Sequence, residues 1–139
     1  MPTTTAGLSD RLVALLIDHV VSAGVTMTVL LLLFSARDPT APVGGVVFSG
    51  VPYLVIFLLY KSGWEGYDGT TLGKRIKGLT VEMQSGGPCT PNAAVVRNLL
   101  LIVDWLPACF LLGAGLVSRT PTGQRLGDRV ADTIVIETM

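Results

Sequence analysis

Three long apolar stretches alternate with polar segments along the chain. They cover residues 12–34, 43–60 and 95–117, which are 23, 18 and 23 residues long. About 20 helical residues cross the hydrocarbon core of a bilayer, with a range of roughly 17–25, so each stretch is long enough to span a membrane. The pattern predicts an all-α integral membrane protein with a single domain over residues 1–139, a polar loop at 61–92 and a tail at 119–139.

The first stretch is predicted to be a permanent transmembrane helix. Its apolar run is longer than the roughly 7–15 residues of a signal peptide, and it contains Asp18 and His19. Ser9 and Asp10 precede it and favour a helix that starts near Asp10, because both residue types cap helix N-termini. The second stretch is predicted to be another full span, and aromatic residues typical of a membrane–water interface follow it, namely Tyr60, Trp64 and Tyr67.

The third stretch leaves two alternatives. Pro107 breaks its helical hydrogen-bond ladder, so the stretch is either one kinked span or a re-entrant segment that leaves on the side it entered. A single crossing divides the Lys and Arg residues six to four between the two sides, whereas re-entry divides them nine to one. Cytoplasmic loops are rich in Lys and Arg, which favours re-entry. Both alternatives place the N-terminus in the cytoplasm, and re-entry places the C-terminus there too.

Composition supports a location in the cell membrane. Half of the chain (50%) is hydrophobic, 14% is charged and the mean hydropathy is +0.61, whereas soluble domains carry roughly 25% charged residues. The net charge is zero, so no basic field is available for nucleic acid. The two cysteines are too few for a disulfide framework or a metal cluster.

The polar loop contains a segment, 69–75, with the outline of a phosphate-binding loop. The segment does not fit that motif, because its glycines are one residue too close and Arg75 replaces the magnesium-binding Ser or Thr. It is instead predicted to be a short amphipathic turn on the membrane surface, with the lysines facing anionic headgroups. Its apolar face consists of Leu72, Ile76 and Leu79, and its cations are Lys74, Arg75 and Lys77. Gly78 ends this turn.

Two β-branched runs that alternate with polar residues predict short strands at 79–83 and 133–136. They are able to form a small cytoplasmic β-pair only if both lie on one side of the membrane. Re-entry of the third stretch permits this pairing, and a single crossing forbids it.

Ionisable residues inside the apolar stretches are the candidate site. Each carboxylate at mid-bilayer costs about 2.5–3.5 kcal/mol on insertion scales, so Asp18 and Asp104 need partners, water or a function. Arg11 and Arg97 each precede one of these aspartates by seven residues and therefore share its helix face. Because side chains lean toward the helix N-terminus, we expect pairing between helices, Arg11 with Asp104 and Arg97 with Asp18.

Two interpretations of these carboxylates compete. Either Asp18 and Asp104 bind and release a proton or a small cation, or they lock two helices together through buried ion pairs. The first is favoured, because intramembrane ionisable groups are most often functional. His19 is either a proton relay or, as we favour, a side chain bonded to a neighbouring carbonyl.

These residues together resemble the RDD family of small membrane proteins, named for one arginine and two aspartates. The resemblance rests on Arg11, Asp18 and Asp104, with Asp128 as an alternative second aspartate. The matching cytoplasmic motif residues are Gly73, Lys74, Arg75, Gly78, Arg125, Gly127, Asp128 and Thr133. The family usually has Gly where Asp132 stands. The resemblance implies a membrane fold and a role in transport that includes cation/proton exchange for some members.

Two functions follow from these observations. The first is transport of protons or small cations by a homo-oligomer, because three short apolar elements hardly enclose a pathway alone. The second is a non-catalytic accessory or assembly role, in which the 61–92 loop and the 119–139 tail dock an unidentified membrane protein. An enzyme is not expected, since the sequence has no convergent Ser/His/Asp set, no metal-spaced His/Cys/Glu cluster and no cofactor loop.

Overall fold

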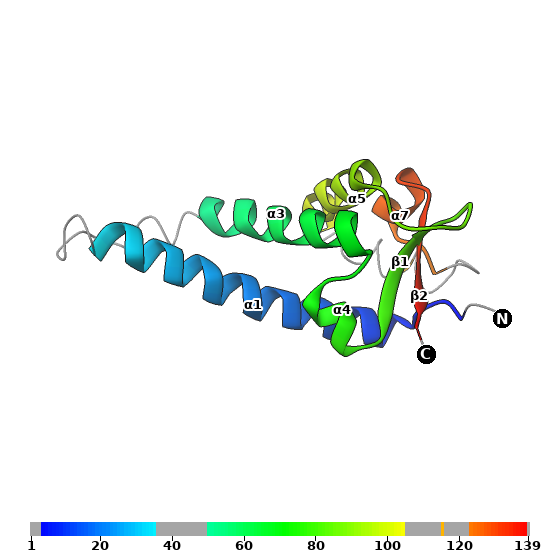
Figure 1. The fold of residues 1–139 in the computed structure, drawn as a ribbon, viewed down its shortest axis with the longest axis horizontal. Helices are drawn as coiled ribbons and strands as arrows, with labels where there is room; N and C mark the ends of the chain where they lie inside the picture. Colours follow the sequence, from blue (N-terminus) through cyan, green and yellow to red (C-terminus); the bar gives the residue numbers. More distant parts are fainter. Residues whose placement is uncertain (1–3, 36–49, 105–114, 116–122, 139) are drawn as a thin grey trace.

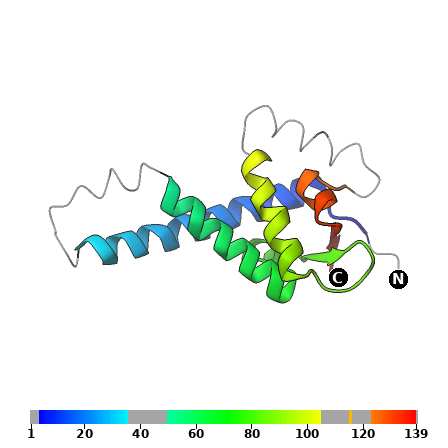
Figure 2. The same ribbon diagram turned by 90° about the horizontal axis from the view of Figure 1, so that it is seen from above.

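The computed structural model describes residues 4–35, 50–104, 115 and 123–138. Its element order is α1 (Leu8–Ser35), α3 (Val51–Asp68), α4 (Leu72–Ile76), β1 (Leu79–Met83), α5 (Pro91–Asp104), α7 (Leu126–Val130) and β2 (Thr133–Glu137). The helix α3 runs back alongside α1, and α5 crosses α3 when the molecule is seen from above (Figures 1 and 2). The short helices, the strands and both labelled ends of the chain gather at one end of α1 (Figure 1). We call this end the cap.

The helix α1 agrees with the first predicted span. It begins at Leu8, two residues before the predicted start, so Asp10 lies in its first turn, where a carboxylate interacts favourably with the helix dipole. Among the described residues, α1 is the one helix that is long and apolar enough to cross a membrane, over Leu8–Phe34. It also leaves many large apolar side chains exposed.

The second and third predicted spans are only partly covered by the described residues. The helix α3 starts at Val51, after Gly50 in the left-handed conformation, and continues eight residues past the predicted end at Tyr60. The helix α5 is a shorter apolar helix over Pro91–Val103. Residues 43–49 and the segment around Pro107 lie outside the described residues, so two full spans and the path of the third stretch stay predictions.

The predicted strands do pair, and they are antiparallel. Leu79 lies opposite Glu137, Val81 opposite Val135 and Met83 opposite Thr133. The N-terminal segment lies along the other side of β2, since Ala6 N–H donates to the Val135 carbonyl at 3.0 Å. A small apolar core lies beside this sheet, built from Ala6, Ala14, Leu79, Val81, Cys89, Ala93, Ala94, Ala131 and Val135. The cytoplasmic location of the pair stays a prediction.

The two short helices and the strands that follow them are two copies of one motif. The sequence Leu-Gly-Lys-Arg-Ile forms α4 and Leu-Gly-Asp-Arg-Val forms α7. Each helix is followed by a residue with positive φ, Gly78 at 62° and Asp132 at 50°, and then by a strand. Val81 and Val135 occupy the same place in the two copies and lie opposite each other in the sheet. The register therefore relates the two strands by a local two-fold axis at this pair.

Candidate functional site

The carboxylate of Asp18 is fully buried and surrounded by donors from α3 and from the loop into α4. Its Oδ1 accepts from the Tyr60 hydroxyl at 3.1 Å and from Gly73 N–H at 2.9 Å. Its Oδ2 accepts from Thr71 Oγ1 at 2.7 Å and from Lys61 Nζ at 3.2 Å. A carboxylate has about four lone-pair sites, and all four are used here. In this structure Asp18 ties α1 to α3 and α4 and offers no free oxygen to an ion.

Glycine is required at the point where α4 meets α1. A Cβ at Gly73 lies only 2.1 Å from the Ala14 carbonyl oxygen and 2.9 Å from Asp18 Oδ1. The equivalent glycine of α7 has the same role, because a Cβ at Gly127 lies 2.6 Å from the Arg97 carbonyl oxygen. Each short helix therefore rests with its backbone directly on a long helix.

A second buried acid, Glu65, was not among the residues singled out from the sequence. It accepts from Lys74 Nζ at 2.6 Å and from Asn98 Nδ2 at 2.9 Å, and it lies 3.5 Å from both Lys61 Nζ and Arg97 Nε. Lys61 and Glu65 are four residues apart on α3, directly after the apolar run. Their i,i+4 spacing is typical of an ion pair on one helix face. Their position in a segment predicted to be a polar loop gave no indication that they are buried.

The third buried acid is Asp128 in α7. Arg97 Nη2 donates to its Oδ1 at 2.8 Å, and Arg11 Nη1 donates to its Oδ2 at 3.2 Å. Arg125 adds its backbone N–H at 3.3 Å and its Nε at 3.4 Å. This carboxylate therefore joins the start of α1 and the middle of α5 to the tail of the chain. Thr133 is buried beside it and donates to the Asp128 carbonyl at 3.4 Å.

The three acids belong to one continuous network. Lys61 bridges Asp18 to Glu65, and Arg97 bridges Glu65 to Asp128. Within the described residues, three acids are surrounded by five cations, namely Arg11, Lys61, Lys74, Arg97 and Arg125. Removing one partner of a buried pair leaves an uncompensated charge and costs about 3–5 kcal/mol. The network thus fixes five helices relative to one another.

Two buried groups in the short helices, Lys74 and Asp128, have a pKa below the ordinary value. Desolvation lowers the pKa of the Lys74 ammonium to about 7, against the opposing attraction of Glu65. For Asp128, burial raises the pKa, but the stronger combined attraction of Arg97, Arg125 and Arg11 leaves it below its usual value. Lys74 and Asp128 are the third residues of α4 and α7, so the two copies of the motif carry opposite charges at equivalent buried positions.

The predicted partners of the arginines were wrong. Arg97 pairs with Asp128 and Glu65. It is not one of the four donors to Asp18 among the described residues. Arg11 pairs with Asp128 in place of the expected Asp104. The side chain of Asp104 lies outside the described residues. The acids that the two arginines contact come from the tail, Asp128, and from α3, Glu65.

The predicted surface role of α4 needs a second correction. Lys74 does not face headgroups, because it is buried against Glu65. Arg75 is exposed and pairs with Asp68. Leu72 and Ile76 are exposed as expected, but Leu79 is buried in the core beside the sheet. Gly78 follows the helix with a φ of 62°, which agrees with its predicted role as the residue that ends it.

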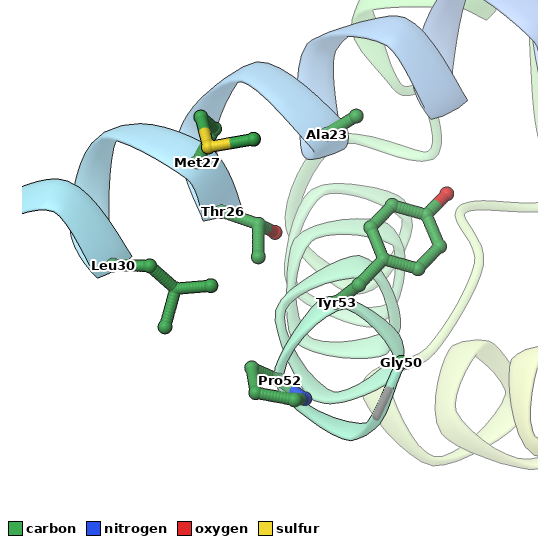
Figure 3. Close-up of a pocket in the computed structure, with 7 residues that line it drawn as sticks. All are labelled: Ala23, Thr26, Met27, Leu30, Gly50, Pro52 and Tyr53. Carbon is green, nitrogen blue, oxygen red and sulfur yellow. The ribbon is translucent and has the colours of Figure 1, made fainter. Parts of the chain in front are cut away.

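His19 of α1 packs against α3 and contacts the side chain of Tyr53. Its Nδ1 lies 2.5 Å from the Tyr53 hydroxyl, and its ring stacks on Phe57 with 4.5 Å between centroids. Tyr53 also lines a cavity of about 260 Å³ with Ala23, Thr26, Met27, Leu30, Gly50 and Pro52 (Figure 3). The lining is mostly apolar. No group of His, Cys, Asp and Glu among the described residues is arranged to hold a metal.

A comparison with models of known protein families shows which family this chain belongs to. The model of the RDD family matches residues 5–132, which is nearly the whole length. The chain belongs to the RDD family. It matches no curated protein and no solved structure.

The matched region of this RDD protein contains every charged member of the network. Arg11 and Asp18, which carried the resemblance, both lie in it, although they bind different partners. Asp128 is the aspartate that Arg11 contacts. We therefore favour Asp128 over Asp104 as the second aspartate of the family signature, a choice that stays a prediction.

Proposed function

We propose that this RDD protein is a non-catalytic membrane accessory protein, in which buried ion pairs hold a rigid cap that docks another membrane protein. The observation that carries the proposal is the saturation of Asp18 by four donors. A carboxylate that exchanges a proton or cation needs an oxygen open to it, whereas a carboxylate that locks helices needs the donors found here. The structural interpretation of the buried acids is thus better supported than ion binding.

The proposal includes a membrane topology. The strands β1 and β2 precede and follow the third apolar stretch, and they pair with each other. Partners in one sheet lie on one side of a bilayer, which supports re-entry of the 95–117 stretch. The nine-to-one division of Lys and Arg then places the cap, the N-terminus and the C-terminus in the cytoplasm. A reporter fused to the C-terminus tests this, and an external reporter contradicts it.

Reconstitution in liposomes tests the accessory role. We expect the purified protein to give no pH change above empty vesicles when sodium or potassium is added. A photo-crosslinker at Tyr67, which is 90% exposed on the cap, is expected to give one discrete adduct with another membrane protein in cells. The same group at Leu32, on the apolar face of α1, is the matched control and is expected to label lipid. An ion-driven pH change from the pure protein contradicts the proposal.

Proton or small-cation transport by a homo-oligomer is the second candidate. One observation favours it: Lys74, with a pKa of about 7, is buried against Glu65 and therefore changes its proton occupancy near neutral pH. Transport through this pair predicts a flux that disappears in Lys74→Met and persists in Lys77→Met, whose lysine is paired with Asp10 at the surface. Equal fluxes in the two variants contradict this candidate.

A further inference from the structure

The two copies of the short helix each expose apolar side chains at equivalent positions. In α4, Leu72 is 46% exposed and Ile76 is 63% exposed; in α7, Leu126 is 39% exposed and Val130 is 59% exposed. The buried face of each helix is instead a glycine and a charged residue. This arrangement is the reverse of a soluble helix, whose apolar face is buried. The exposed apolar faces therefore need an apolar environment outside the chain.

The depth of α4 and α7 in the proposed membrane arrangement follows from their contacts with the backbones of α1 and α5. The helix α4 rests on Ala14 through Gly73, and α7 rests on Arg97 through Gly127. Ala14 and Arg97 are each the third residue of a predicted apolar stretch, 12–34 and 95–117. Both short helices consequently lie at the level where polar chain changes to apolar chain, which is the boundary between headgroups and hydrocarbon.

The side chains around α4 fit this boundary. The guanidinium of Arg75 lies over the Trp64 ring at 5.7 Å, and Trp and Arg are residues that occupy membrane interfaces. The exposed cations of α4 and of the residue after it are paired within the chain, since Arg75 pairs with Asp68 and Lys77 Nζ lies 2.7 Å from Asp10. Among the described residues of this helix no exposed cation is left without a carboxylate, so its contact with lipid depends on apolar burial.

We propose that α4 and α7 are a matched pair of interfacial anchors that insert Leu72, Ile76, Leu126 and Val130 into the headgroup–acyl boundary of the surrounding phospholipid bilayer. This inference rests on the membrane-embedded arrangement proposed above. The anchors extend the hydrophobic contact of α1 and α5 around the cap, and each is held at its depth by one glycine contact and by the buried ion network. Because they act by apolar insertion, they need no anionic lipid.

Fluorescence quenching of the full-length protein in liposomes tests the proposal. With Cys89 and Cys109 replaced by serine, a bimane label is placed at one site per variant, Ile76→Cys or Val130→Cys. The control Ser85→Cys carries the label in the exposed turn after β1. We expect lipid bearing a nitroxide at acyl carbon 5 to quench both anchor labels several-fold more than the control, and iodide in the water to quench the control most. Phosphatidylcholine with and without phosphatidylglycerol is expected to give the same result.

A further label, at Leu32→Cys, separates failure of the anchors from failure of the membrane arrangement. If Leu32 is quenched by lipid and either anchor label is quenched by iodide instead, the paired anchors are contradicted and the membrane arrangement stands. If Leu32 is not quenched by lipid, the membrane arrangement itself is contradicted. Protection of an anchor label from both quenchers indicates a protein cover and overturns the lipid assignment, as does quenching that requires phosphatidylglycerol.

Discussion

Arg97 and Asp128 form a buried ion pair, with Nη2 and Oδ1 separated by 2.8 Å. Arg97 lies at the start of an apolar stretch, and Asp128 lies in the polar tail that follows it. The pair therefore holds α5 and α7, which precede and follow residues 105–122 of the chain, against each other. Arg11 binds the other oxygen of Asp128, so the start of α1 is held to the same carboxylate.

Loss of the Asp128 charge is expected to destabilise the fold strongly. Asp128→Asn leaves Arg97 without its closest carboxylate, and the expected cost is about 3–5 kcal/mol of unfolding free energy, measured by denaturation in detergent micelles. Asp132→Asn is the matched control, because Asp132 is exposed and asparagine tolerates its positive φ. Equal stabilities of the two variants contradict the role of Asp128.

Alanine at the two contact glycines is expected to disturb helix packing. Gly73→Ala and Gly127→Ala force a Cβ against a backbone carbonyl, with an expected loss of about 1–3 kcal/mol each, measured by thermal unfolding. Gly63→Ala is the control within α3, since a Cβ there meets nothing within 4 Å. It is expected to stabilise the helix by roughly 0.5–1 kcal/mol. A neutral Gly73→Ala contradicts the close approach of α4 to α1.

The Asp18–Lys61 pair is expected to show strong energetic coupling. In a double-mutant cycle of Asp18→Asn and Lys61→Met, the double variant loses less than the sum of the single losses, by roughly 0.5–3 kcal/mol, because neither charge is left buried alone. The exposed pair Asp68–Arg75 is the control, with an expected coupling of about 0–1 kcal/mol. Additive losses at Asp18 and Lys61 argue that the two charges are not in contact.

The pKa of Lys74 predicts a stability that rises with pH. Its pKa is about 7 in the folded chain and 10.5 ordinarily, so between these values the unfolded chain binds the proton that the folded chain has lost. Unfolding free energy therefore increases over this window. Unfolding measured across it is expected to show a rise in the wild type and in Lys77→Met that is absent in Lys74→Met. If Lys74→Met shows a rise of the same size, the pH dependence of the unfolding free energy comes from another titratable group.

Periodicity predicted part of the fold from the sequence. The alternating runs at 79–83 and 133–136 gave the strand pair. The seven-residue spacing singled out Arg11 and Arg97, but the partners inferred from it were wrong. Glu65 and Asp128 were not predicted as buried, because each lies in a polar segment where local composition indicates exposure. Their burial depends on cations that are distant in sequence, which no local pattern reports.

The membrane character of this protein was determined by the sequence alone, because hydrophobic transfer depends on the length and composition of a continuous stretch. The partners of its buried charges were decided by the tertiary structure. An ion pair depends on distances between side chains, and those distances were set when Gly73 and Gly127 allowed two short helices to rest on the long ones. Asp18 thus has its donors from α3 and α4, and Asp128 has the arginines of α1 and α5.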